Sequence, residues 1–279
     1  IDCVNSVGGK ILPKLLKKLG VETIYELYCE PNGNFPHNPE PLPENLGSIS
    51  KLVKEKKADV GFVVDPDVDR LAIICEDGTM FGEEYTLVAV SDYVLSFKLG
   101  NTVSNLSSTR ALKDITEQYN MKYYASAVGE VNVVQKMKEV NAVIGGEGNG
   151  GVIYPALHYG RDALIGIALF LTYLAKKKIK CSELKEQYPQ YVISKNKIQL
   201  SSGINPDSII EILKNKYSQK YSINTEDGLK IDLGKEWIHL RKSNTEPIIR
   251  IYAESNTLEN ANKLAKMIED EVNKITNKE

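Results

Sequence analysis

The spacing of hydrophobic positions predicts alternating strands and helices over the first part of the chain. In residues 1–80 an apolar N-terminal segment leads through a Gly-Gly turn into an amphipathic helix at 10–19. Strands are expected at 23–28 and, after a Pro-rich loop and a second helix, at 59–64. Such alternation is typical of a parallel sheet covered by helices. This block is therefore expected to form one α/β domain.

The same rhythm continues to about residue 190 and then changes. Helices are expected at 86–98, after the segment 107–111, after Gly129 and over the apolar run 163–175, with strands between them. The remaining elements are strands at 194–200 and 228–232, a hairpin across 236–255, and helices from 205 and at 258–275. The prediction is an α/β fold with two consecutive α/β/α domains, 1–80 and 81–190, whose sheets are mixed and mainly parallel, and a C-terminal α+β domain at 191–279.

Composition supports this picture and excludes several classes of protein. The chain has 279 residues, a hydrophobic fraction of 42% and a formal net charge of -2, as expected for a soluble globular protein of two or three domains. Its 35 basic and 37 acidic residues argue against a broad nucleic-acid or membrane surface, so neither partner is expected. The run 163–175 is shorter than the roughly 20 residues of a membrane span and predicts a buried helix instead.

The four cysteines, at positions 3, 29, 75 and 181, form no Cys-x-x-Cys pair and indicate neither a zinc site nor a disulfide framework. A reducing cytoplasm is the expected location. The sequence opens at Ile1 in what reads as a buried strand, without a charged and apolar leader. We therefore expect a fragment that starts at a domain boundary, with no signal peptide.

An acidic loop gives the first chemical signal. In VVDPDVDRLAII, residues 63–74, Asp65, Asp67 and Asp69 interrupt an apolar run at every second position. Carboxylates so close together repel one another and need a cation or basic groups to neutralise them. Mg²⁺ prefers such oxygens and keeps positions for water or phosphate. The three aspartates are thus candidate Mg²⁺ ligands, and Arg70 is placed to hold an anionic substrate.

Two other interpretations of this loop are an EF-hand calcium loop and a solvated acidic turn. Glu76 stands twelfth from Asp65, as in an EF-hand, but the sixth position is Arg70 in place of Gly and an apolar strand follows. The simpler alternative is a solvated acidic turn. The third Asp, the Arg and the flanking apolar runs favour the cation site.

Two further loops carry polar side chains suited to a phosphorylated sugar. In VIGGEGNGGVIYP, residues 143–155, glycines surround Glu147 and Asn149, which could read sugar hydroxyls; a flexible turn is the alternative, and neither nucleotide-loop spacing is met. In RKSNTEPIIR, residues 241–250, guanidinium, hydroxyl and amide groups suit a phosphate, with a polar hairpin as the alternative. The candidate phosphate-binding residues are Arg241, Ser243, Asn244, Thr245 and Arg250.

The order of these loops resembles the α-D-phosphohexomutase family, which includes phosphoglucomutase/phosphomannomutase and phosphoglucosamine mutase. DPDVDR resembles the family's DGDGDR magnesium loop, GEGNGG its GEMSG-type sugar loop and RKSNTEP its R-x-S-[NG]-T-E-P phosphate loop. The resemblance covers nearly the whole chain and implies domains two, three and four of a four-domain enzyme. It implies Mg²⁺ at the aspartates, with Arg70 in the catalytic site.

The family's first domain carries the serine that donates its phosphoryl group, in a TASHNP-like motif that this sequence lacks. Ser107 and Ser108 lack that context and are not assigned. Where one branch of the family has histidines, this chain has Glu130 and Gly151, and His158 is expected to be structural. Acid and base roles thus stay open.

The resemblance implies transfer of a phosphoryl group between the 1- and 6-positions of a hexose phosphate by way of a bisphosphate. The expected partner is a phosphoserine domain, without which this fragment is expected to be inactive. The alternative is a non-catalytic module that binds phosphosugar or Mg²⁺. Glucose, mannose and glucosamine phosphates are not distinguished by the sequence.

Overall fold

The structure, a computed structural model, describes residues 1–201, 204–243 and 246–276. These form two compact units, which are described separately. The first unit comprises Ile1–Ala125 and Gly129–Pro189, and the second comprises Ser126–Val128 and Gln190–Glu279.

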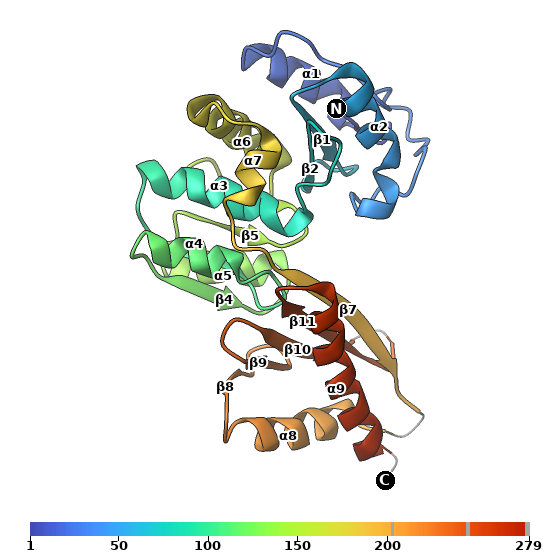
Figure 1. Ribbon diagram of the computed structural model, residues 1–279, viewed down its shortest axis with the longest axis vertical. Coiled ribbons are helices and arrows are strands. Elements are labelled where there is room, and N and C mark those ends of the chain that lie inside the picture. The colour runs from blue at the N-terminus through green and yellow to red at the C-terminus, as the bar shows by residue number, and fades with distance from the viewer. Residues whose placement is uncertain (202–203, 244–245, 277–279) are drawn as a thin grey trace. The chain divides into compact units, whose positions relative to one another are not determined.

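Helices and strands of the first unit follow one another much as the sequence predicts (Figure 1). In chain order they are α1 (Gly8–Lys18), the 3-10 turn η1 (Pro43–Asn45), α2 (Gly47–Lys56), β1 (Val60–Val64), β2 (Leu71–Cys75), α3 (Glu83–Phe97), β3 (Thr102–Asn105), α4 (Ala111–Gln118), β4 (Tyr123–Ser126), α5 (Glu130–Glu139), β5 (Ile144–Glu147), β6 (Gly151–Ile153), α6 (Ala163–Lys177) and α7 (Cys181–Glu186).

The sheets of the first unit are mixed, which confirms the predicted fold class. β1 and β2 pair antiparallel, and a second sheet has the order β4-β3-β5-β6, with β3 parallel to β5 and β5 antiparallel to β6. The short acidic loop explains the first pairing, because only antiparallel neighbours can be joined so directly. The strand expected at 23–28 is reduced to a single parallel bridge between Leu27 and Asp2.

Helix α6 confirms the prediction of a buried apolar helix and has a defined start. The Asp162 side chain accepts the N–H groups of Leu164 at 2.7 Å and Ile165 at 3.2 Å, as an N-cap residue does. α6 packs against α3, which is buried along most of its length. The cap fixes the position of the residue before it, Arg161.

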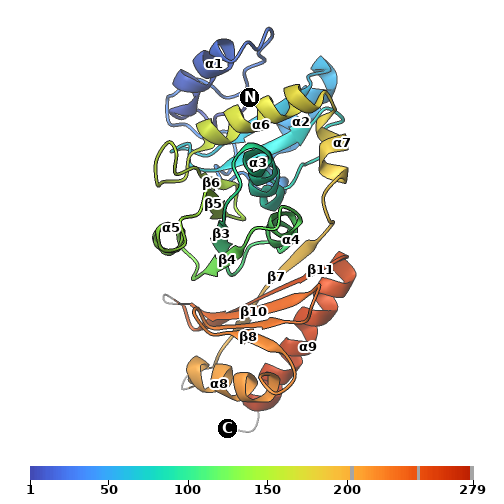
Figure 2. The same cartoon turned by 90° about the vertical axis from the view of Figure 1, so that its left-hand side faces the viewer.

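The second unit is an antiparallel sheet with two helices on one face (Figure 2). The strand order is β7-β11-β10-β9-β8, and apolar side chains of the strands, such as Ile251 and Leu240, form one core with those of both helices. The elements are β7 (Val192–Gln199), α8 (Pro206–Tyr217), β8 (Ser222–Asn224), β9 (Leu229–Asp232), β10 (Trp237–Lys242), β11 (Ile248–Ser255) and α9 (Leu258–Thr276). The predicted hairpin is the pair β10–β11.

Among the described helices, none is both long enough and apolar enough to cross a membrane. The cytoplasmic location stays a prediction.

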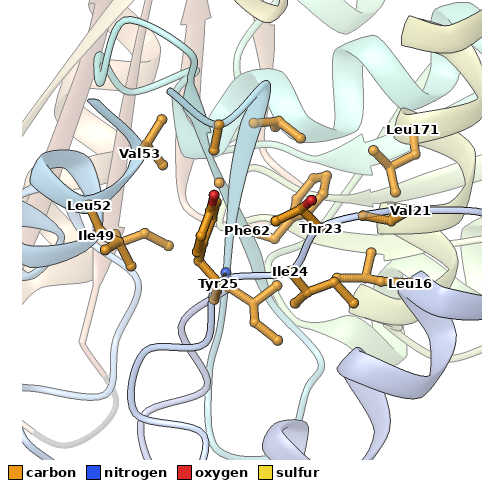
Figure 3. A pocket seen from close by; sticks show the side chains of 14 residues that line it. Leu16, Val21, Thr23, Ile24, Tyr25, Ile49, Leu52, Val53, Phe62 and Leu171 are labelled. Atoms are coloured by element: carbon orange, nitrogen blue, oxygen red, sulfur yellow. Dashed lines mark hydrogen bonds between the residues drawn. The ribbon is translucent and has the colours of Figure 1, made fainter. Parts of the chain in front are cut away.

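A small apolar cavity of about 70 Å³ lies in the first unit beside α1, α2 and β1 (Figure 3). Leu16, Ile49 and Phe62 are among the side chains that surround it, and none of its described lining residues has an acidic or basic side chain. The predicted site residues lie elsewhere.

Candidate functional site

The loop between β1 and β2 folds around the carboxylate of Asp65. Oδ1 of Asp65 accepts the backbone N–H groups of Asp69 and Arg70, both at 3.0 Å, and its carbonyl accepts the N–H of Val68 at 3.1 Å. Asp65 is buried, Asp69 half-buried and Asp67 exposed. With this loop conformation, one carboxylate oxygen from each aspartate lies within 4.8 Å of the others. The structure thus brings the three predicted metal ligands together.

Asp65 and Asp69, the two less exposed aspartates, each use one carboxylate oxygen for hydrogen bonds. Asp69 Oδ2 accepts a hydrogen bond from Arg161, whereas Asp69 Oδ1 is buried and bonds to no described residue. Asp65 closes the loop through Oδ1, which leaves Oδ2 facing Arg70. Arg70 Nε lies 3.7 Å from both of the remaining oxygens.

This donor set fits a divalent cation. A buried carboxylate oxygen without a hydrogen bond is costly unless a ligand contacts it. Asp69 Oδ1 is such an atom, and carboxylate oxygens are the ligands that Mg²⁺ prefers. Burial, together with the nearby carboxylates of Asp69 and Asp67, raises the pKa of Asp65 to about 7. The loop therefore concentrates more negative charge than its own residues offset.

Val68, between the two later aspartates, has a left-handed backbone with φ of 61°. A β-branched residue in this region costs on the order of 1–3 kcal/mol, and such strain is concentrated at functional sites. The carbonyl of Val68 accepts the N–H of Ala163 at 3.0 Å, which ties the loop to the start of α6. The surrounding structure thus holds the loop in an otherwise unfavourable conformation.

Glu147, predicted to read sugar hydroxyls, is buried at the end of β5. Its Oε1 accepts Asn105 Nδ2 at 2.8 Å and the Gly129 N–H at 3.2 Å, and its Oε2 accepts Arg161 Nη1 at 2.7 Å. A carboxylate can accept about four hydrogen bonds, so one position is left for a hydroxyl. The side chain is held rigidly.

The glycines around Asn149 allow the sugar loop to pack directly on β2. A Cβ on Gly150, whose φ is +85°, would lie 2.3 Å from the carbonyl oxygen of Leu71. Leu71 in turn donates its N–H to the carbonyl of Gly150 at 3.1 Å. Asn149 Oδ1 accepts the Gly151 N–H at 3.1 Å, which leaves the amide Nδ2 to donate. The acidic loop and the sugar loop are therefore neighbours in the first unit.

Arg161 is the residue that the sequence interpretation missed. Its guanidinium contacts both Asp69 and Glu147 and lies 3.6 Å from Glu130 Oε2. The signal in the sequence was a basic residue directly before an N-capping Asp, but nothing there indicated that it reaches a loop 92 positions earlier.

In the second unit the two predicted arginines are cross-strand partners. Arg250 of β11 stands opposite Arg241 of β10 on one side and opposite Lys197 of β7 on the other. Directly opposed side chains share a face of the sheet, and like charges there are destabilising. We call these three residues the basic row. Beside it lies a hollow of about 300 Å³ lined by Lys195, Asn196, Lys197, Glu246, Ile248, Arg250 and Tyr252.

The three residues of the basic row differ in their surroundings. Arg241 Nε lies 2.7 Å from Asp227 Oδ2, whereas Arg250 and Lys197 are exposed. Ser243, at the start of the hairpin turn, donates its N–H to the Ile248 carbonyl at 3.0 Å. The predicted residues Asn244 and Thr245 lie outside the described part of the chain.

His158 and Ser108, to which the sequence gives no catalytic role, have structural partners. His158 Nε2 lies 2.9 Å from Asp162 Oδ2, at the α6 cap. The Ser108 hydroxyl is buried, donates to Asn105 Oδ1 at 3.0 Å and accepts the Gly148 N–H at 2.9 Å. Ser108 thus supports the sugar loop.

Comparison with known proteins gives the class of protein. The family model for phosphoglucomutase/phosphomannomutase α/β/α domain II matches residues 1–78, domain III matches 82–191, and the C-terminal domain matches 195–271. The chain therefore belongs to the phosphohexomutase family and covers these three domains, which confirms the resemblance seen in the loops.

Individual relatives agree with this assignment. A phosphoglucomutase/phosphomannomutase of Thermococcus kodakarensis is 35% identical over 94% of this chain, and a phosphoglucosamine/phosphogalactosamine mutase of Sulfurisphaera tokodaii is 34% identical over 95%. A crystal structure of a phosphoglucomutase/phosphomannomutase family protein from Burkholderia thailandensis superposes with a TM-score of 0.82 at 27% identity over 98% of the chain. The chain spans 57%, 59% and 58% of the lengths of these three proteins, respectively.

Proposed function

We propose that this chain supplies the metal-, sugar- and phosphate-binding parts of a phosphohexomutase, an isomerase that moves a phosphoryl group between the 1- and 6-positions of a hexose phosphate. The observation that carries the proposal is the cluster of carboxylate oxygens on Asp65, Asp67 and Asp69, in a chain whose relatives bear mutase names. The domain boundaries at 80 and 190 are part of this proposal.

The acidic loop is the proposed transfer end of the site. Phosphoryl transfer depends mainly on positioning and on offsetting the charge of the phosphoryl oxygens. A bound Mg²⁺ would supply a divalent positive charge there, held by Asp65, Asp67 and Asp69. Arg70 is proposed to contact the phosphoryl group, because its guanidinium already lies 3.8 Å or less from three carboxylates and can exchange them for phosphate oxygens.

Two loops are proposed to bind the substrate. Glu147 has one acceptor position left and Asn149 one amide group, so together they can pair with a sugar hydroxyl as acceptor and donor. The phosphate far from the transferring group is assigned to Arg241, Ser243, Asn244, Thr245 and Arg250. Their guanidinium, hydroxyl and amide groups are the donors that a phosphate requires.

The phosphoryl donor is proposed to be a phosphoserine on a domain outside these residues. The chain spans less than two thirds of its relatives' lengths, which leaves room for such a domain. By this proposal the chain alone binds Mg²⁺ and phosphosugar but does not turn the sugar over.

The test is an assay of the longest gene product that contains this chain. Glucose, mannose and glucosamine 1-phosphates would each be supplied with Mg²⁺ and a trace of the matching 1,6-bisphosphate, and formation of 6-phosphate measured. We expect turnover of at least one sugar, and its loss in Asp67→Asn. Binding without turnover of any of the three, in protein shown to be serine-phosphorylated, would contradict the mutase proposal and favour a binding module.

A further inference from the structure

Arg161 connects the acidic loop to the sugar loop through a single guanidinium. Nη2 donates to Asp69 Oδ2, Nη1 donates to Glu147 Oε2 at 2.7 Å, and Nε lies 3.6 Å from Glu130 Oε2. The Arg161 side chain is only 15% exposed, and those of Asp69 and Glu147 are 18% and 5% exposed. Contacts this well shielded from water are screened far less than surface ion pairs.

The backbone around Arg161 fixes the direction of its side chain. Its N–H donates to Glu130 Oε1 at 3.0 Å, and the next residue, Asp162, caps α6. On the other side, a Cβ on Gly151 would lie 2.4 Å from Arg161 Cδ. The side chain therefore runs through space that only glycine at 151 leaves open, so the guanidinium has little freedom to move.

We propose that Arg161 is a positioning residue that makes binding of a divalent cation at the aspartates and of a phosphosugar at Glu147 cooperative. The inference rests on the proposed function of the two loops. It concerns a residue that lies in none of the loops to which that function was assigned.

The geometry gives the physical reason. Arg161 occupies Asp69 Oδ2 and so leaves Oδ1, which accepts no hydrogen bond from a described residue and lies 3.7 Å from Arg70 Nε, to face the cation. The same rigid fork fixes Oε2 of Glu147. Both carboxylates are therefore positioned by one guanidinium, so a ligand that changes the contact of Arg161 with either loop changes its contact with the other, and the two binding steps are coupled. Outer partners of metal-binding carboxylates typically change metal affinity by about 10–100-fold when removed.

A different role for Arg161 predicts the opposite change in cation affinity when the residue is removed. If Arg161 were only a counter-charge competing with the metal for Asp69, its removal would strengthen cation binding. A positioning role predicts weaker binding, because Asp69 loses its orientation and Glu147 is left buried without its cationic partner.

The experiment titrates the chain with Mn²⁺, followed by loss of the free-ion EPR signal, with and without saturating glucose 1,6-bisphosphate. The variants are Arg161→Met, which removes the charge, Arg161→Lys, which keeps charge but not the fork, and Gly151→Ala, which displaces the side chain. Arg110→Met is the matched control, since Arg110, the residue before α4, has a side chain that is 13% exposed and pairs with Asp114 of that helix. Circular dichroism verifies that each variant folds.

We expect Arg161→Met to weaken Mn²⁺ binding by about 10-fold or more, and to reduce the bisphosphate's enhancement of Mn²⁺ affinity to less than half. Arg161→Lys and Gly151→Ala should fall between wild type and Met, and Arg110→Met should match wild type. Unchanged or tighter Mn²⁺ binding, or full restoration by Lys, would overturn the positioning role alone. A wild-type chain that binds neither probe would overturn the proposed function as well.

Discussion

The acidic loop and the basic row are both clusters of like charge, but they are stabilised in different ways. The aspartates of the loop are partly buried, their neighbours Arg70 and Arg161 offset them, and backbone N–H groups hold Asp65. The basic row lies on strands of a sheet, with Asp227 beside Arg241 and two of its three cations exposed.

The difference indicates two kinds of ligand. A loop whose shape is set by internal bonds, with one oxygen per carboxylate left over, suits a small ion that demands fixed geometry. The basic row, with two exposed cations on neighbouring strands, suits a larger anion, whose binding depends less on the exact positions of the side chains. The acidic loop should therefore tolerate changes poorly, and the basic row should respond gradually.

Lowering the pH should produce the largest effect on stability, by adding a charge next to the basic row. Burial, assisted by the positive charges of Lys230 and Arg241, lowers the pKa of His239 to about 4 from an ordinary value of 6.5. Between these values the unfolded chain binds a proton that the folded chain excludes, so the free energy of unfolding falls as pH falls from 6.5 to 4. The contribution lost by pH 4 is roughly 3 kcal/mol.

Urea unfolding of wild type and His239→Gln across this range isolates the effect, because both proteins share all other titrating groups. The free energy of unfolding of the wild type should fall more on acidification than that of the variant. Above the ordinary histidine pKa the two free energies should change with pH in the same way. Parallel curves at every pH would show that His239 does not carry the dependence.

Removing one carboxylate should abolish most of the cation affinity while sparing the fold. Asp67 is the exposed member of the loop, so Asp67→Asn removes a ligand charge and relieves repulsion without opening a cavity. Loss of a residue that only contacts a metal ligand typically lowers metal affinity by about 10–100-fold. Because Asp67 is itself a proposed ligand, we expect the Mg²⁺ affinity measured by calorimetry to fall by about 100-fold or more. Asp59→Asn, an exposed Asp just before β1, is the control and should leave affinity unchanged.

Truncation in the basic row should weaken phosphosugar binding less steeply. A hydrogen bond to a charged group contributes about 1.5–3 kcal/mol, so Arg241→Met should lower affinity for glucose 1,6-bisphosphate by about 10–100-fold. Equilibrium dialysis measures this directly. Retained affinity would move the phosphate site elsewhere.

Lys197→Met should weaken bisphosphate binding least among these variants, and it should not reduce the stability of the fold. Exposed charges contribute little, so a loss of about 2–5-fold is expected. The substitution also removes a cation directly opposite Arg250, so the melting temperature should stay level or rise. The control is Lys235→Met, an exposed lysine in the β9–β10 turn. An equal loss of bisphosphate affinity in Lys235→Met would exclude a specific role for Lys197.

The fold class and the grouping of Asp65, Asp67 and Asp69 could be predicted because periodicity and spacing are local properties of the sequence. The antiparallel pairing of β1 with β2 followed from the length of the loop and was overlooked. Lys197 could not be placed, because its position opposite Arg250 depends on the register of β7 against β11.

Arg161 was beyond prediction for a similar reason. Its partner Asp69 is distant in sequence, and its path depends on the absence of a Cβ at Gly151. The assignment of Glu147, Asn149, Arg241, Ser243 and Arg250 to substrate stays a prediction.

The proposed function requires the acidic loop to bind one divalent cation, and anomalous diffraction from crystals soaked in Mn²⁺ can locate that ion. One anomalous peak should appear within bonding distance of carboxylate oxygens from Asp65, Asp67 and Asp69, including Oδ1 of Asp69. No peak at the loop, in crystals whose Mn²⁺ concentration saturates the chain in solution, would contradict it.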